Sequence, residues 1–333
     1  MTETTIEKAV LHILDTAAGL PVLSERFLAL EDSAEFFEKH IDRLLEDSEL
    51  KECAFETGED PMRELIANSM TEDFIPATRQ MAESLFRIMS ENVEIPSADV
   101  LFAIFRNNSR RFLGIIKFNY KEAFTHDLSY VEGSAATGVI RHKALYASDT
   151  QKVDECVFID LGSGAIRIKE KKYEINGQKE YYLSNRFIRT APARSYKEQY
   201  KLVERSAEQI VKKYYTGDSL KQAEVKMAIR NNVDKNMEID IDDLSKDAFH
   251  DSPDMQTQYK QELSQKGLTE KKIKINKQIY NELERNHRLI TDIGIKMEIP
   301  GDLMNDKSKL EFFVNQDGTM SILIKNVNEV KSR

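Results

Sequence analysis

The chain has 333 residues, of which 41% are hydrophobic and 32% are charged, and its formal net charge is −9 at pH 7. This length can bury the core of one large domain or of two smaller ones. No apolar run approaches the roughly 18 residues of a membrane span, which argues against an integral membrane protein. Two widely spaced cysteines, Cys53 and Cys156, lack the spacing of a structural zinc site.

The start of the chain, "MTETTIEKAV", has neither the basic segment nor the apolar segment of a secretory signal. We therefore expect a cytoplasmic protein.

Charge is distributed unevenly along the chain. Residues 1–98 carry 22 acidic and 8 basic side chains, residues 99–214 carry 14 and 21, and residues 215–333 carry 21 and 19. The regional charges are therefore −14, +7 and −2. An acidic first third followed by a basic middle can present an electropositive face that the negative total conceals.

The first third predicts a hairpin followed by helices. The stretches "AVLHILD" and "PVLSERFLAL" alternate partly and flank a turn-prone Ala-Ala-Gly segment, so we expect two paired strands within residues 8–30. Helical spacing of apolar residues then predicts helices near 33–50, 61–70 and 73–91.

The middle third predicts a mostly antiparallel sheet. Its two long apolar runs, "VLFAIFR" and "RFLGIIKFNY", flank the polar turn 107–110. Further strands are expected in "GVIRHKALYA", "ECVFIDL", "AIRIKEKKYEI" and "KEYYLSN", while the "AFTHDLSY" stretch with His126 and Asp127 is expected to be a loop.

The last third returns to helical periodicity from Ser195, in stretches ending near 216, 231, 249 and 266, and then to strands. The Asp317-Gly318 pair inside "LEFFVNQDGTMSILIKNV" predicts a C-terminal β-hairpin. The fold class we predict is α+β, with a central, mostly antiparallel sheet flanked by helical regions. We expect an acidic lobe at 1–98, a basic sheet at 99–194 and a helical region at 195–333, as lobes of one or two domains.

No nucleotide-binding loop, dinucleotide fingerprint, zinc-hydrolase or serine-hydrolase motif is present. One weak catalytic pattern remains. Asp160 with Glu170 and Lys172 matches the D...ExK spacing in which two carboxylates hold a divalent metal and a lysine orients water in many nucleases. Since Asp, Glu and Lys are abundant in this chain, the solvated edge of a strand is the more ordinary interpretation.

Basic residues of the middle third form the other candidate site. Strand alternation places Arg141 with Lys143 on one face, and Arg167 with Lys169 and Lys171 on one face. A basic sheet surface for DNA phosphates and a solvated sheet face explain these residues about equally well. The candidate phosphate contacts are Arg106, Arg110, Arg111, Arg141, Lys143, Arg167, Lys169, Lys171, Arg186 and Arg189.

Four stretches carry a resemblance to a known family. They are "VLHILDTAAGLPVLSE", "LFAIFRNNSRRFLGIIKFNYKEAFTH", "KKYEINGQKEYYLSNRF" and "LITDIGIKMEIPGDLMNDKSKLEFFVNQDGTMSILIKNV". In this order they resemble the bacterial 37-kDa nucleoid-associated protein family. The resemblance implies a cytoplasmic protein that associates with the nucleoid, with no established enzymatic activity and no catalytic residues to carry over.

From the residues and the resemblance together, we predict a non-enzymatic nucleoid-associated protein that contacts DNA mainly at phosphates. No metal site and no cofactor are expected. Two alternatives stay open, namely an interaction module brought to the nucleoid by a DNA-processing partner and a metal-dependent nuclease. The oligomeric state stays open as well, a homo-oligomer included.

Overall fold

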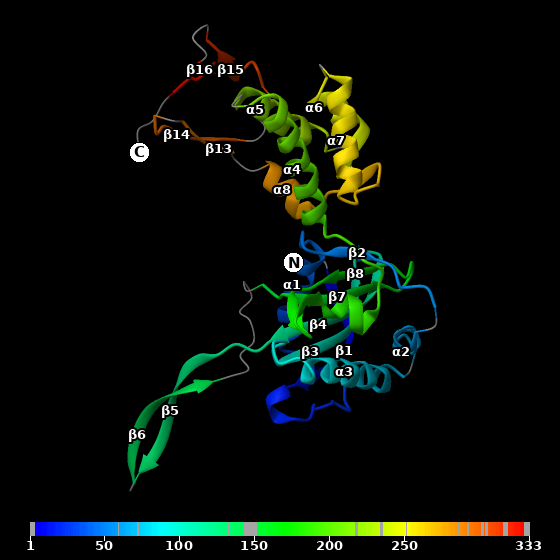
Figure 1. Ribbon diagram of the computed structural model, residues 1–333. Coiled ribbons are helices and arrows are strands. Elements are labelled where there is room, and N and C mark those ends of the chain that lie inside the picture. Colours follow the sequence, from blue (N-terminus) through cyan, green and yellow to red (C-terminus); the bar gives the residue numbers. More distant parts are fainter. Residues whose placement is uncertain are drawn as a thin grey trace. The chain divides into compact units, whose positions relative to one another are not determined.

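The computed structural model describes residues 4–58, 60–71, 73–131, 133–142, 152–216, 219–233, 236–250, 252–284, 287–291, 293–300, 303, 306–315 and 319–329. Lys143 and the Asp317-Gly318 pair lie outside these ranges. The chain divides into two compact units, Met1–Ser195 and Tyr196–Arg333 (Figure 1). None of the helices in the described ranges is long and apolar enough to cross a membrane.

Within the described residues, the first unit contains a large antiparallel sheet, three α-helices and smaller elements. Its elements are β1 (Thr4–Leu14), η1 (Thr16–Ala18), α1 (Ala34–Leu45), β2 (Lys51–Cys53), α2 (Pro61–Ser69), α3 (Phe74–Ser90), β3 (Ala98–Asn107), β4 (Arg110–Asn119), β5 (Ala123–Val131), β6 (Ser134–His142), β7 (Glu155–Asp160), β8 (Ile166–Lys169), β9 (Lys172–Ile175), β10 (Gln178–Tyr181) and the π-helix η2 (Leu183–Ile188).

Six strands form the sheet in the order β1-β3-β4-β7-β8-β2, and every neighbouring pair is antiparallel. In the middle of the sheet, Ala103 of β3 pairs with Ala9 on one side and with Gly114 on the other. A Cβ atom at Gly114 would lie only 2.9 Å from the ring of Phe105, so glycine leaves room for that ring. The continuous apolar runs of β3 and β4 are therefore buried central strands.

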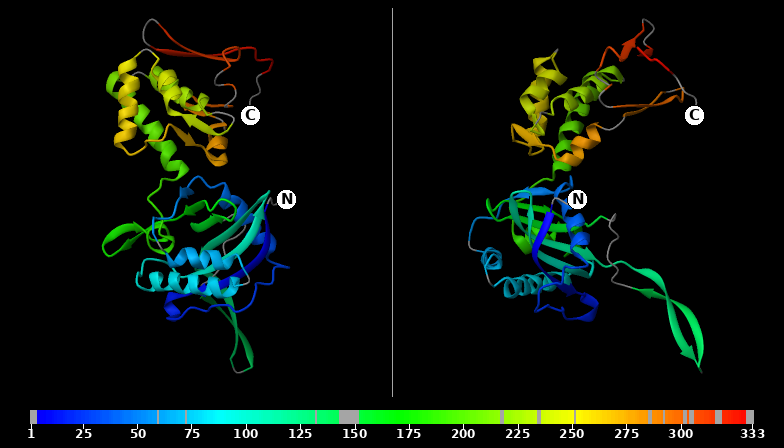
Figure 2. Two further views of the ribbon diagram at one scale, coloured as in Figure 1. Left: turned by 90° about the vertical axis from the view of Figure 1, so that its right-hand side faces the viewer. Right: turned by 180° about the vertical axis from the view of Figure 1, so that it is seen from behind.

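Helices cover both faces of the sheet. α3 covers one face of the sheet (Figures 1 and 2). Phe102 and Leu113 point to this face, where they join one core with Met81 and Leu85. On the opposite face, the rings of Phe37 and His40 from α1 pack against Phe118 at 5.7 Å. Because apolar residues recur every three or four positions in both helices, each helix has a stripe that faces the sheet.

Burial on both faces forces the charged residues inside the sheet into pairs. Lys117 of β4 donates to Glu155 of β7 at 3.0 Å, and Asn119 and Tyr173 donate to the same carboxylate oxygen. Burial lowers the pKa of Lys117, whereas the Glu155 carboxylate raises it. Breaking such a pair leaves an uncompensated buried charge, so it constrains the packing of these two strands.

β5 and β6 form a two-stranded ribbon that is separate from the sheet (Figures 1 and 2). The ribbon lies in the chain between β4 and β7, which are themselves neighbours in the sheet. Their register runs from Ala123 opposite His142 to Val131 opposite Ser134.

The second unit consists of helices followed by short strand pairs. Its elements are α4 (Tyr196–Tyr214), α5 (Ser219–Asn231), β11 (Glu238–Asp240), α6 (Ile241–Ala248), α7 (Pro253–Gln265), β12 (Lys272–Lys274), α8 (Lys277–Glu284), β13 (His287–Ile290), β14 (Lys296–Ile299), β15 (Leu310–Val314) and β16 (Met320–Ile324). Its core joins Val203 and Ile210 of α4 to Leu244, Tyr259 and Ile273.

The predicted α+β class, with an antiparallel main sheet flanked by helices and a C-terminal hairpin, is confirmed. The N-terminal hairpin is wrong, because residues 21–30 do not form a strand. Val22 makes an isolated bridge to Ile13, and Leu28 donates one backbone hydrogen bond to Ala9. Two further segments were misassigned. The stretch 123–130, expected to be a loop, lies in β5, and residues 183–185, expected to end the strand "KEYYLSN", lie in the π-helix η2.

A buried histidine makes the stability of the first unit depend on pH. The backbone N–H of Ser24 donates to His12 Nδ1, so the Nε2–H of the neutral ring donates to Thr78 Oγ1 at 3.2 Å. Burial, followed by the nearby Arg79 charge, lowers the pKa of His12 to about 4 from its ordinary 6.5. Between these two values the unfolded chain binds the proton and the folded chain does not, so stability falls as pH falls.

Replacing this ring should therefore flatten the pH dependence. Between pH 7 and 4.5, the wild-type free energy of unfolding should fall by about 2–3 kcal/mol more than that of His12→Gln, because the variant cannot ionise there. Urea denaturation at the two pH values measures the free energy of unfolding of the wild type and of the variant. An equal loss in the two proteins would contradict a neutral buried His12.

Candidate nucleic-acid interface

The turn between β3 and β4 places arginines at one end of the sheet. Asn107, the last residue of β3, pairs with Arg110, the first residue of β4. The loop between the two strands therefore has two residues, Asn108 and Ser109. Asn108 has φ 52°, a left-handed conformation that asparagine adopts at lower cost than most residues. The tight turn fixes the backbone position of Arg110, the first residue of β4. The side chain of Arg110 is 72% exposed.

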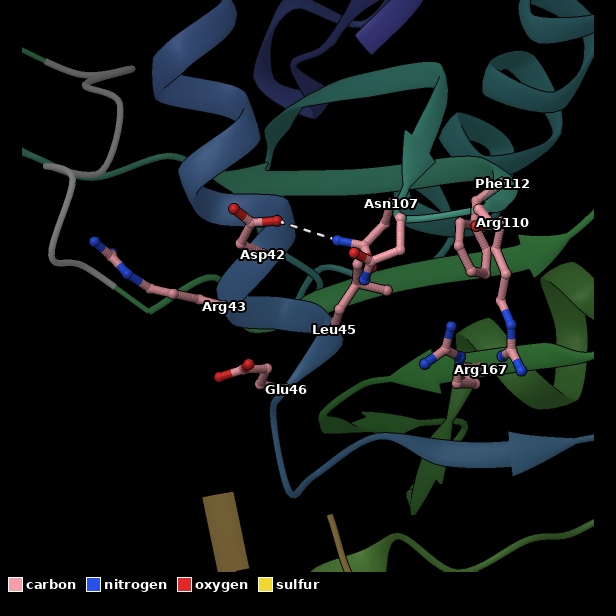
Figure 3. Close-up of a pocket in the computed structure, with 10 residues that line it drawn as sticks. Asp42, Arg43, Leu45, Glu46, Asn107, Arg110, Phe112 and Arg167 are labelled. Carbon is pink, nitrogen blue, oxygen red and sulfur yellow. Dashed lines mark hydrogen bonds between the residues drawn. The ribbon is translucent and has the colours of Figure 1, made fainter. Parts of the chain in front are cut away.

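A cleft of about 580 Å³ lies beside this turn (Figure 3). Figure 3 shows Arg110 and Arg167 extending from β4 and β8 along one wall, with the end of α1 forming the other. Asn107 ties the two walls together by donating to Asp42 at 3.3 Å. The residues that line the cleft are Asp42, Arg43, Leu45, Glu46, Asn107, Asn108, Ser109, Arg110, Phe112 and Arg167.

Cations of the turn outnumber their carboxylate partners. Arg106 and Arg111 share one carboxylate, Glu7, at 2.5 and 2.6 Å. Partial burial raises the pKa of Glu7. The hydrogen bonds and positive charges of the two guanidinium groups together lower it by more, so the net shift of the pKa is downward. Glu7 is therefore ionised at neutral pH and balances one of the two positive charges.

The two arginines on the cleft wall are held loosely by protein partners. Arg110 Nη1 lies 3.9 Å from Asp160, whose other oxygen accepts hydrogen bonds from the backbone N–H groups of Gly162 and Ser163. The guanidinium of Arg167 lies 5.2 Å from the centre of the Phe112 ring and makes no ion pair within the described residues. An anionic ligand at this wall would thus meet two guanidinium groups that point outward from fixed backbone positions.

Lys169 cannot take the predicted role of a phosphate contact, because it is 2% exposed. Its ammonium donates to Asp47 at 2.7 Å and to the carbonyl oxygen of Val153 at 2.6 Å. Alternation does place Lys169 on the same face as Arg167, but that face is covered here, so the pattern did not mean a solvent-facing basic surface.

The other predicted phosphate contacts are dispersed over the first unit. Each of those that the structure describes lies beside a carboxylate. Arg141 is paired with Glu122 at 2.9 Å, Lys171 with Asp154 at 2.7 Å, Arg186 with Glu180 at 2.6 Å and Arg189 with Asp60 at 4.0 Å. Of the ten predicted residues, Arg110 and Arg167 line the cleft. Arg106 and Arg111 are paired beside the turn on the opposite face of the sheet and do not line the cleft.

The strand register places the two carboxylates of the predicted nuclease pattern, Asp160 and Glu170, at opposite ends of the β7–β8 pair. Asp160 ends β7 at the turn, whereas Glu170 follows β8 opposite the start of β7, where Glu155 lies. Five strand positions, or roughly 16 Å, lie between these ends. Glu170 is moreover bound to Lys51 at 3.1 Å and accepts from the backbone N–H of Ser184. The two carboxylates therefore cannot hold one metal ion, and the described residues contain no group of three potential metal ligands.

Arg43 is a cleft residue that the sequence argument missed. It lies in the last turn of α1 and is exposed beside the turn residues. No spacing rule joins a helix near residue 43 to a turn near residue 108. Only the packing of α1 on the sheet brings them together.

The fold and this site define an α+β protein with exposed arginines at the β3–β4 turn. A family model described as nucleoid-associated protein YejK matches residues 10–331. The chain therefore belongs to this family of nucleoid-associated proteins, which confirms the resemblance and associates the chain with the nucleoid. No curated protein matches the chain.

The structural role of Lys169 can be separated from a role in binding. Lys169→Met should lower the free energy of unfolding by about 3–5 kcal/mol, because Asp47 is left as an unpaired buried charge. Adding Asp47→Asn should recover part of the loss. The exposed Lys171→Ala serves as control and should stay within about 0.5 kcal/mol of wild type in urea denaturation. A Lys169→Met variant as stable as this control would contradict the buried pair.

Proposed function

We propose that this nucleoid-associated protein is non-enzymatic and binds duplex DNA directly through phosphate contacts at the β3–β4 turn. The observation that carries the proposal is the cleft beside this turn, where Arg110 and Arg167 line the wall and Arg43 lies at the end of α1. A guanidinium group can donate two parallel hydrogen bonds to a phosphate, which suits it to this ligand.

The proposed contact reads the DNA backbone and not the bases. Arg106 and Arg111 flank the turn, and Arg43 lies at the cleft. No helix in the described residues carries a recognition motif that would place several side chains against base edges. Phosphate contacts position a protein on the duplex but carry no sequence information. We therefore expect similar affinity for duplexes of different sequence.

Salt dependence tests the proposal. Each phosphate contact steepens the slope of log K against log salt by roughly 0.9 through counterion release. The double variant Arg110→Ala/Arg167→Ala should bind duplex DNA more weakly and lose about 2 from the magnitude of this slope. Fluorescence anisotropy with a labelled duplex at several salt concentrations measures both quantities.

A matched variant controls for net charge. Lys171 and Lys179 are exposed cations of the same unit, outside the cleft. Lys171→Ala/Lys179→Ala removes the same two charges and should keep the wild-type slope. The proposal fails if the wild type does not bind at low salt, or if the two double variants lose affinity equally.

Association through a protein partner is the second candidate function. It is favoured by a specific observation, since Arg141, Lys171, Arg186 and Arg189 all face carboxylates and are less available to phosphates. Co-precipitation from nuclease-treated extracts separates the two. A partner-mediated association keeps its protein partner after digestion, whereas proteins bridged by DNA are released.

A further inference from the structure

The β5–β6 ribbon has one apolar face that is open to solvent. Residues directly opposite each other in an antiparallel pair share a face, so Phe124, Leu128 and Tyr130 of β5 lie on the same face as Val139 of β6. Their exposed fractions are 71%, 55%, 71% and 73%. The other face carries small or polar residues over most of its length, among them Thr125, Asp127 and Ser129.

Such a ribbon is an unusual element to leave uncovered. A two-stranded hairpin alone is marginally stable in water, because it has no second layer against which to bury its apolar side chains. The described residues supply no such layer, since each residue from Ala123 to Tyr130 is exposed. Apolar patches of several hundred Å² on a protein surface commonly mark interaction sites.

The chemistry of this face does not suit DNA. In the part of the face that the structure describes, the basic side chains are His126 and Arg141, and Arg141 is paired with Glu122 at 2.9 Å and lies 5.7 Å from the centre of the Phe124 ring. A phosphate backbone would therefore find almost no free cation on the face. The occupant should instead be an apolar protein surface of similar length.

We infer that two copies of this chain associate by stacking the apolar faces of their β5–β6 ribbons. The order of side chains supports a second copy as the occupant. Along β5, an aromatic residue stands near each end of the face, Phe124 at the base and Tyr130 near the tip, with His126 and Leu128 between them. When two such ribbons stack in antiparallel fashion, Phe124 of each lies over Tyr130 of the other, so the face complements itself under twofold symmetry.

The area of the face sets the strength of this contact. With roughly 200 Å² per aromatic side chain, Phe124 and Tyr130 offer about 280 Å² per copy at their observed exposure. With Leu128 and Val139 included, two stacked ribbons cover about 1,000 Å², which is near the lower limit of specific interfaces. A dimer that forms at micromolar concentration and dissociates on dilution is therefore expected. This inference does not depend on DNA binding.

A charge placed on either face of the ribbon tests the contact. In this stack Leu128 lies over His126 of the second copy. Leu128→Asp would bury a carboxylate among the side chains of the two stacked faces and should weaken the dimer roughly 100-fold or more. Ser129→Asp puts the same charge on the opposite face of the same strand and should dimerise like the wild type. Mass photometry and sedimentation velocity of the full chain over a concentration series give the dissociation constants, and circular dichroism shows whether each variant is folded.

Two outcomes would overturn the inference. One is a wild-type chain that stays monomeric up to roughly 200 μM, and the other is a Ser129→Asp variant that dissociates as much as Leu128→Asp. DNA binding by the turn can be measured on the same Leu128→Asp protein, so the failure of one proposal is distinguishable from the failure of the other.

Cross-linking tests the antiparallel order. Phe124→Cys mixed with Tyr130→Cys should form a disulfide-linked dimer under mild oxidation, while each variant alone should form far less. Residues 124 and 130 are six strand positions, or roughly 20 Å, apart, so they would not meet in a parallel stack. Cross-linking by each single variant as strong as that of the mixture would overturn the antiparallel stacking.

Discussion

Lys117 and Glu155 face each other across β4 and β7, inside a sheet that helices cover on both sides. That double cover constrains the rest of the first unit. A cation within such a strand has no water to reach, so it is retained only with a carboxylate beside it. Lys169 with Asp47 and Lys51 with Glu170 follow the same rule. Cations remain available to a ligand where the cover ends, as for Arg110 at the β3–β4 turn and for Arg167 of β8, which both line the cleft.

The same constraint explains why an acidic first third accompanies a basic middle. Asp47 and Glu7 come from the acidic region, and they neutralise Lys169 and Arg111 of the basic region inside one folded unit. Part of the opposite charge of the two regions therefore pairs between them. A basic composition in one stretch of sequence thus overstates the positive surface that the folded protein shows.

The spacing of apolar residues was enough to predict the central strands and most helices. A continuous apolar run such as "VLFAIFR" is typical of a buried strand, and apolar residues every three or four positions, as in α3, are typical of a helix that packs on a sheet. It was not enough for β5, which alternates but lacks the continuous apolar run of the central strands. The site was harder still. Arg110 could be found from its turn, but the burial of Lys169 depends on which face α1 covers, and the place of Arg43 depends on the same packing. Alternation shows which residues share a face and does not show what lies over it.

The ribbon occupies a particular place in the order of strands. β4 and β7 are antiparallel neighbours, so a short turn would be enough to connect them, yet the chain between them makes the whole excursion through β5 and β6. The ladder from Phe112 opposite Asp160 to Lys117 opposite Glu155 closes without any residue of that excursion. The ribbon is thus an insertion whose length and side chains can change while the scaffold keeps its register. The pairing of β4 with β7 depends on residues outside the ribbon, so a substitution in the ribbon leaves that pairing in place.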